Sequence, residues 1–254
     1  MASQSNKQKL NTFHLFAGAG GGILADLLLG HNPIGACEIE PYPRDVLLAR
    51  QRDGILPNFP IWDDICTLDG KPWRGSVDIV CGGFPCQDLS IANPNAKGID
   101  GERSGLWSEM LRFIDDVQPE EVFVENSPML ISRGIGRVIC DLSKIGYVGK
   151  YTIMGGHETG SCTDGKRIWI YATKADGLGR PKNEVQTFQL SAPASCERQF
   201  SRAISATWDE ATDSRMRRDT DAMARGMERL KAIGNGQDPI LAATAFNILS
   251  EGLI

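Results

Sequence analysis

The chain has 254 residues, of which 41% are hydrophobic and 23% charged, and its formal net charge is −5. This balance excludes a disordered chain, whose apolar content would be lower and whose net charge would be higher. A chain of this length forms one large domain, or one domain with a small insert, and buries a substantial core without disulfides or metals.

Cysteines and apolar runs indicate the compartment. There are seven cysteines, an odd number, and no CxxC pair, so neither a disulfide framework nor a metal site is indicated and reduced thiols are expected. The polar start, Met1–Asn11, is not a signal peptide. The longest apolar run, Ile23–Leu29, is short and interrupted by Asp26, so no membrane span is predicted. We expect a soluble, cytoplasmic protein.

Charge is unevenly distributed along the chain. Residues 1–165 carry a net charge of −7, whereas residues 166–231 carry +4. An acidic body with one basic segment suits an enzyme that touches a polyanion through that segment alone. A chance scatter of surface charge is the alternative.

Strands and helices alternate through the first two thirds of the chain. Strands are predicted at Thr12–Phe16, Ile34–Glu38, Val77–Cys81, Glu121–Glu125 and Ile168–Ala172. Helices are predicted at Ile23–Leu29, Arg44–Arg52, Leu106–Val117 and Ile135–Ile145, with a last apolar helix at Ile240–Leu249. This order predicts an α/β fold with a parallel, doubly wound sheet that binds ligands at the carboxyl ends of its strands.

A glycine-rich loop, Phe16-Ala17-Gly18-Ala19-Gly20-Gly21-Gly22, follows the first strand and opens a helix. Its glycines let the backbone approach a ligand closely and present N–H groups at the helix N-terminus. Ile23 stands where a dinucleotide fingerprint has its third glycine, which disfavours a nicotinamide oxidoreductase. Glu38, at the end of the second strand, is placed to bind ribose hydroxyls. A tight turn beside a solvated glutamate is the alternative.

Two later strands also end in reactive side chains. In Cys81-Gly82-Gly83-Phe84-Pro85-Cys86-Gln87, Cys81 lies within an apolar strand and is expected to be a buried small hydrophobe. Cys86 lies in the loop at the ligand crevice, where a thiolate would be a nucleophile and an inert loop cysteine is the alternative. Glu125 ends an apolar run, so burial predicts a raised pKa and a carboxyl that donates a proton, rather than an ordinary strand-end acid.

Together these motifs resemble the cytosine-C5 DNA methyltransferase family. FAGAGG, PCQ, ENS and IGNG occur in the family's order, and the resemblance covers Phe13 to about Ala172 and returns at Ile233–Leu249. It implies a Rossmann-like fold, S-adenosylmethionine as cofactor with S-adenosylhomocysteine as product, and a flipped cytosine of double-stranded DNA as substrate. We expect a compact, monomeric member, bacterial or phage-encoded, of the restriction-modification type.

The resemblance also implies the cofactor contacts. The glycine loop and the second-strand acid correspond to Phe16, Gly18, Gly20 and Glu38. Asp64 corresponds to the acid at the adenine amino group, with Ile65 beside the ring. Leu106, in the motif Arg103-Ser104-Gly105-Leu106-Trp107, would lie against the cofactor, and Asn235 would contact its methionine end.

Three catalytic residues are implied in the same way. Cys86 would attack carbon 6 of cytosine, Glu125 would hydrogen-bond N3 and the exocyclic amine, and Arg167 would contact the cytosine carbonyl or a nearby phosphate. The base that removes the C5 proton is not assigned. The family's eighth motif, Gln-x-Arg-x-Arg, reads Thr163-Asp164-Gly165-Lys166-Arg167 here, and no ninth motif is found.

These motifs divide the chain into three parts: a catalytic domain at 12–174, a recognition segment at 175–226, and a closing motif with a helix at 227–254 that packs back on the catalytic domain. The recognition segment is short and rich in arginine, which predicts phosphate contacts and a short or degenerate target sequence. Two alternatives remain open. One is an RNA (tRNA) cytosine-C5 methyltransferase, and the other is a catalytically impaired homologue that keeps cofactor and nucleic acid.

Overall fold

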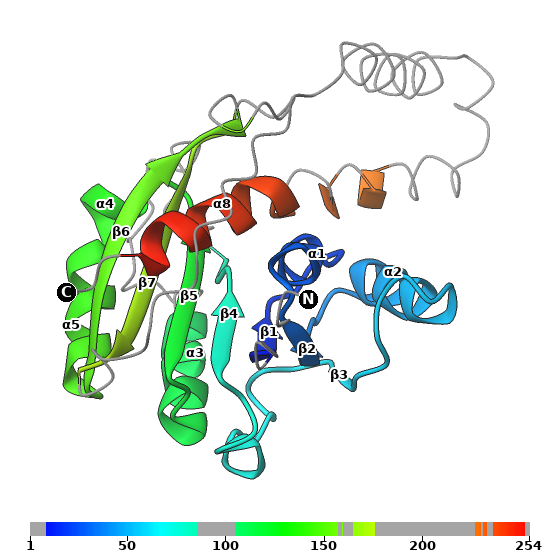
Figure 1. The fold of residues 1–254 in the computed structure, drawn as a ribbon, viewed down its shortest axis with the longest axis horizontal. Coiled ribbons are helices and arrows are strands. Elements are labelled where there is room, and N and C mark those ends of the chain that lie inside the picture. Colours follow the sequence, from blue (N-terminus) through cyan, green and yellow to red (C-terminus); the bar gives the residue numbers. More distant parts are fainter. Residues whose placement is uncertain are drawn as a thin grey trace, which may run out of the picture.

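A computed structural model describes residues 9–85, 105–156, 159, 165–175, 227–229, 231–232 and 236–251. Within these residues seven strands form a sheet in the order β3-β2-β1-β4-β5-β7-β6 (Figure 1). The strands are β1 (Asn11–Leu15), β2 (Asn32–Cys37), β3 (Ile61–Trp62), β4 (Ile79–Gly82), β5 (Glu121–Asn126), β6 (Tyr147–Met154) and β7 (Arg167–Lys174). The helices are α1 (Gly21–Leu29), α2 (Pro41–Arg52), the 3-10 turn η1 (Lys71–Trp73), α3 (Gly105–Val117), α4 (Leu130–Arg133), α5 (Ile135–Lys144) and α8 (Pro239–Ser250).

The predicted α/β class and doubly wound, Rossmann-like arrangement are confirmed, but the sheet is mixed rather than all parallel. Strands β1 to β5 pair in parallel, whereas β7 runs antiparallel to both β5 and β6. The sequence analysis missed β6, the two-residue β3 and the short helices η1 and α4. β6 lies at the edge of the sheet and exposes Val148, Tyr151 and Ile153, so it lacks the apolar run that marks the central strands.

Side chains alternate between two hydrophobic cores, one on each face of the sheet. On β5, Val122 and Val124 pack into the first core and Phe123 packs into the second. On β7, Ile170 packs into the first core and Trp169 into the second. α3 and α5 cover the first core, while α1 and α8 cover the second (Figure 1). Because successive strand residues point to opposite faces, a central strand must be apolar on both, which explains the continuous apolar runs.

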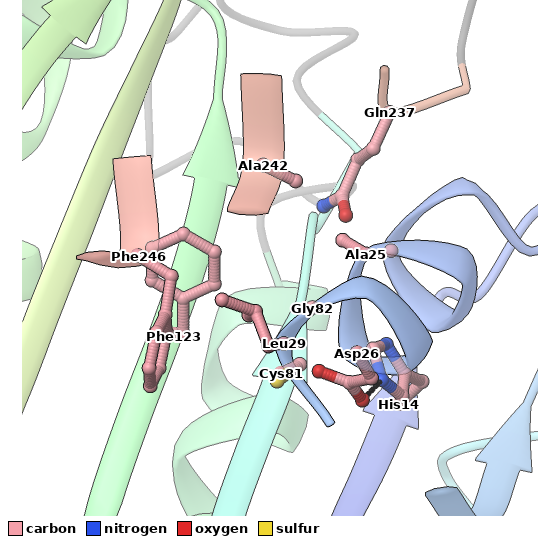
Figure 2. Close-up of a pocket in the computed structure, with 11 residues that line it drawn as sticks. His14, Ala25, Asp26, Leu29, Cys81, Gly82, Phe123, Gln237, Ala242 and Phe246 are labelled. Atoms are coloured by element: carbon pink, nitrogen blue, oxygen red, sulfur yellow. Dashed lines mark hydrogen bonds and ion pairs between the residues drawn. The ribbon is translucent and has the colours of Figure 1, made fainter. Parts of the chain in front are cut away.

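The last helix, α8, packs against α1 and against strands β6 and β7. Its start is well defined, because the Asp238 carboxylate accepts hydrogen bonds from the backbone N–H groups of Ile240 and Leu241 at 3.0 and 3.1 Å, and Pro239 follows it. The Phe246 ring meets the Phe123 ring edge to face, with centroids 5.3 Å apart (Figure 2). The C-terminal helix therefore forms part of the same layer as α1.

A buried carboxylate fastens α1 to the sheet. Asp26 is 4% exposed and accepts a hydrogen bond from the Thr12 hydroxyl, while His14 Nε2 contacts the same carboxylate and His31 Nδ1 lies 3.2 Å from its other oxygen. Burial raises the pKa of Asp26, but the charge and hydrogen bonds of His14 and His31 outweigh it and hold the pKa well below its usual range. Figure 2 shows Asp26 and His14 pointing toward each other beneath α1.

The structure describes four of the seven cysteines. In the described part of the chain, Cys37, Cys66, Cys81 and Cys140 are free thiols, and none of the helices is long and apolar enough to cross a membrane. The recognition segment at 175–226 lies outside the described residues apart from Ala175.

We predict that Asp26→Asn lowers the free energy of unfolding by about 1–3 kcal/mol at pH 7, because it removes the buried carboxylate that Thr12, His14 and His31 contact. Since the folded-state pKa of Asp26 is lowered, its stabilisation is complete above the ordinary carboxyl pKa and is lost as the pH falls through about 4 toward the folded-state value. The gap between wild type and variant should therefore narrow below about pH 4.

Urea unfolding at pH 7 and at pH 3.5 measures both effects. Asp45→Asn, at an exposed carboxylate on α2, is the matched control and should change the unfolding free energy by less than about 0.5 kcal/mol. Equal stability of Asp26→Asn and wild type at pH 7 would contradict the conclusion that the Asp26 carboxylate holds α1 on the sheet.

Candidate functional site

Four predicted site segments meet at one edge of the sheet. β1, β2, β4 and β5 are parallel, so their carboxyl ends lie together. The glycine loop follows β1, Glu38 follows β2, Gly83 follows β4, and Glu125 lies near the end of β5. The structure therefore brings the predicted cofactor loop and the predicted catalytic carboxyl to the same edge.

The glycine loop is a tight turn held against β2. Phe16 has a φ of 54°, Gly18 of 55° and Gly20 of 92°, which are left-handed conformations that glycine adopts without strain and a residue such as Phe16 adopts only under local constraint. The Ala17 N–H donates to the Cys37 carbonyl at 3.0 Å. Gly20 then caps α1 and leaves the first N–H groups of the helix at the sheet edge.

Glu38 ties this loop to the second strand. Its Oε2 accepts a hydrogen bond from the Gly18 N–H at 2.6 Å and its Oε1 one from the Glu40 N–H at 2.8 Å. The residue is 7% exposed. A carboxylate has about four lone-pair positions, so two remain for a ligand hydroxyl.

An apolar side chain beside Glu38 escaped the sequence analysis. Ile39 is 61% exposed and directly follows Glu38, just beyond the end of β2. An exposed isoleucine at a ligand-binding edge offers an apolar surface to a flat ring. The available signal was its place immediately after the predicted ribose acid.

The remaining expected cofactor contacts border the first core. Ile65 is buried in that cluster, and Phe16 and Leu106 are partly buried against it. Asp64 has turned its carboxylate toward the backbone, where Oδ1 accepts from the Cys66 N–H at 2.9 Å. The Ile65 carbonyl accepts from Arg112 at 2.7 Å, which holds the Asp64–Ile65 segment against α3.

Glu125 is a largely buried carboxyl, with 12% of its side chain exposed, and its pKa is strongly shifted. Burial raises the pKa to about 7, although the charge of Arg167 and a hydrogen bond from Gln237 both lower it. Arg167 Nε lies 3.0 Å from Glu125 Oε1. Such a carboxyl exchanges protons near neutral pH, as the sequence predicted from its apolar strand.

Arg167 and Gln237 show where the expectation was incomplete. Arg167 was expected to contact a substrate carbonyl or phosphate, and in the structure it pairs with Glu125. Gln237 was not singled out, although it stands directly after the IGNG motif. That position was the only sequence signal for it, since a glutamine there has no chemical signature of its own.

Two predicted residues, Cys86 and Asn235, lie outside the described residues, and their placement remains a prediction. Pro85, which directly precedes Cys86, follows β4 at the same edge as Glu125. Cys81 is buried within the second core, and burial together with the charges of Asp26 and Glu121 raises the pKa of its thiol well above the usual range. The prediction that Cys81 is a packing residue is confirmed.

Comparison with known proteins identifies a family match over most of the chain. The model of the C-5 cytosine-specific DNA methylase family matches residues 10–236. Type II methyltransferase M2.BsuMI of Bacillus subtilis (strain 168) is 34% identical over 145 residues, which cover 54% of this chain and 35% of that protein. Type II methyltransferase M.NgoFVII of Neisseria gonorrhoeae is 29% identical over 191 residues, covering 68% and 46%. The chain thus matches less than half the length of these relatives.

Solved structures share the fold. The Dnmt2 methyltransferase of S. pombe superposes with a TM-score of 0.55 at 20% identity, and the methyltransferase EhMeth of Entamoeba histolytica with 0.54 at 18%. Each match covers 74% of this chain and 58% of the other. At this identity the likeness concerns the arrangement of strands and helices.

We predict that Arg167→Gln raises the pKa of Glu125 above its present value of about 7, because a nearby positive charge favours the ionised form and its loss removes that support. Carboxyl carbon NMR of glutamate-labelled protein follows the titration directly. Lys174→Gln is the matched control, because Lys174 pairs with Glu120 at the opposite end of β7. A titration of Glu125 that moves equally in both variants, or in neither, would contradict the assignment.

Proposed function

Because the chain belongs to the C-5 cytosine-specific DNA methylase family, we propose that it transfers a methyl group from S-adenosylmethionine to carbon 5 of cytosine in DNA. One observation carries the proposal: the glycine loop bonded to Glu38 lies at the same edge of the sheet as Glu125, a largely buried carboxyl whose pKa is raised to about 7. A ligand bound by the glycine loop and Glu38 would thus lie beside Glu125.

The residues at this edge fit S-adenosylmethionine. Glu38 keeps two lone-pair positions for ribose hydroxyls beyond its bonds to Gly18 and Glu40. Exposed Ile39 offers an apolar surface to the adenine ring. The first turn of α1 leaves N–H groups and the positive end of the helix dipole at this edge, where they would attract the carboxylate of the cofactor. When bound, the cofactor supplies an electrophilic methyl group on a sulfonium.

The reaction assigns a separate role to each protein group. The Cys86 thiolate would add to carbon 6 of cytosine, and the electrons of the ring double bond would shift to carbon 5. Carbon 5 would then take the methyl group from the sulfonium sulfur, which leaves S-adenosylhomocysteine. Glu125 hydrogen-bonds N3 and the exocyclic amine, and a carboxyl with a pKa of about 7 shares a proton with N3 as charge develops there. Loss of the carbon 5 proton to a base then restores the double bond and expels the thiolate.

The substrate must reach this site as a single base. Carbon 6 is inaccessible in a stacked duplex, so the target cytosine leaves the helix before Cys86 attacks. We further propose that residues 12–174 with the closing segment 227–254 form the catalytic unit, and that the arginine-rich segment 175–226 contacts the DNA. The position of α8 on α1 supports grouping the closing segment with the catalytic unit.

We predict that Glu38→Ala weakens S-adenosylmethionine binding by about 1.5–3 kcal/mol for each lost hydrogen bond, because the carboxylate is a charged acceptor. Isothermal calorimetry on the full chain measures the dissociation constant. Asp45→Ala, on the exposed side of α2, serves as control and should bind like wild type. Wild-type affinity in Glu38→Ala would remove the ribose assignment.

We predict that Cys86→Ala abolishes methyl transfer and leaves cofactor affinity nearly intact, because the thiol acts on the base. The assay uses labelled S-adenosylmethionine with plasmid DNA and, in a parallel arm, with tRNA. Wild type should label DNA and, on a duplex containing 5-fluorocytosine, form an adduct that survives denaturation, while Cys86→Ala should do neither.

Cys81→Ala is the matched control, since Cys81 is buried and its thiol has a raised pKa. It should keep the chemistry, with any loss arising from packing. Substantial turnover by Cys86→Ala would overturn the covalent mechanism. Labelling of tRNA alone would replace the DNA substrate with RNA, and binding without transfer by wild type would identify an impaired homologue.

A further inference from the structure

Gln237 lies between the first turn of α1 and the end of β5. A Cβ added to Gly21 would lie 1.9 Å from the Gln237 carbonyl oxygen, and one added to Gly22 would lie 2.4 Å from Gln237 Oε1. Atoms do not approach this closely, so glycine at both positions is what allows the segment before α8 to reach the helix. Figure 2 shows the Gln237 carboxamide pointing into the space between α1 and β4.

The other side of the carboxamide faces Glu125. Gln237 hydrogen-bonds the Glu125 carboxyl, and a Cβ on Gly83 would lie 2.8 Å from Glu125 Oε2 and 3.4 Å from Gln237 Nε2. An ionised carboxylate only accepts, so Nε2 is the donor and Oε1 is the atom that faces Gly22. Glycines at 21, 22 and 83 thus leave a slot that the glutamine side chain fills.

We propose that Gln237 is a positioning residue for Glu125: its amide, held in the glycine slot, donates to the carboxyl and fixes the orientation in which that carboxyl meets the cytosine ring. The inference rests on the proposed function, in which Glu125 contacts the base. Arg167 holds Glu125 Oε1 from β7, and Gln237 holds the carboxyl from the segment before α8. Two donors on different elements leave a carboxyl far less free to rotate than one.

The charged groups around Glu125 are few in the part of the chain that the structure describes. Arg167 contacts it from β7, and Gln237 contacts it as a neutral donor. The neighbouring Asp238 carboxylate accepts from the first turn of α8. Removal of the Gln237 donor should therefore destabilise the ionised form of Glu125 and raise its pKa.

The first experiment compares Gln237→Met with wild type in single-turnover methyl transfer to plasmid DNA. Methionine keeps the length of the side chain and removes both amide groups. We expect the rate to fall roughly 10- to 100-fold, the range for loss of a hydrogen bond to a charged group, with the dissociation constant for S-adenosylmethionine changed less than about threefold. In a Glu125→Gln background the same change should add little, because Gln237 acts through Glu125.

Gln118→Met is the matched control, since Gln118 donates to Asp115 at the opposite end of the sheet. A Gln237→Met protein that transfers methyl groups at the wild-type rate overturns the positioning role. So does a loss that is as large in the Glu125→Gln background as alone. Wild type without methyl transfer overturns the proposed function instead, and the second experiment then decides on Gln237.

The second experiment needs no activity. Carboxyl carbon NMR follows the Glu125 titration in wild type, Gln237→Met and Gln237→Glu. We expect the pKa of Glu125 to rise above about 7 in Gln237→Met and further in Gln237→Glu, where a second carboxyl faces the first. An unchanged Glu125 titration in both folded variants overturns the contact on which the proposal depends.

Discussion

The close approach of the α8 segment to the first turn of α1 is the constraint on which the rest of the site depends. A side chain at Gly21 would collide with the Gln237 backbone, and one at Gly22 with the Gln237 amide. The same glycines belong to the loop that meets Glu38. A single run of glycines therefore serves two purposes: it opens the backbone to a ligand on one side and to the C-terminal segment on the other.

Asp26 and Glu125 show how neighbouring groups set the pKa of a carboxyl that is largely shielded from water. Asp26 has a hydroxyl and two imidazoles around it, and its pKa is held well below the usual range. Glu125, on β5, is slightly more exposed, with Arg167 on one side and the neutral Gln237 on the other, and burial raises its pKa to about 7. The first carboxylate stays ionised and stabilises the fold, whereas the second keeps a proton within reach at neutral pH.

The C-terminal segment joins the site through contacts with distant parts of the chain. Lys231 pairs with Glu40 at 2.8 Å, just beyond Glu38, and α8 packs its apolar face on α1. Glu40 and Lys231 are exposed, so this pair contributes little by itself. The packing of α8 carries most of the energy, because its buried side chains leave water only when they cover the second core.

Much of this protein was determined by its sequence alone. The apolar runs around Val80 and Val124, the glycine loop and the periodicity of Leu106–Val117 depend on local spacing. They were enough to predict the central strands, the five longer helices, the α/β class and, with the PCQ and IGNG motifs, the family. The tertiary structure decided what spacing does not encode. β6 and the antiparallel direction of β7 follow from pairing at a sheet edge, where half-exposed residues leave a weak pattern. The partners of Asp26, the Arg167–Glu125 ion pair and the place of Gln237 join residues that are 5 to more than 100 positions apart. Such contacts form only when the chain closes on itself, because hydrogen bonds and buried charges depend on distances in space that sequence separation does not specify.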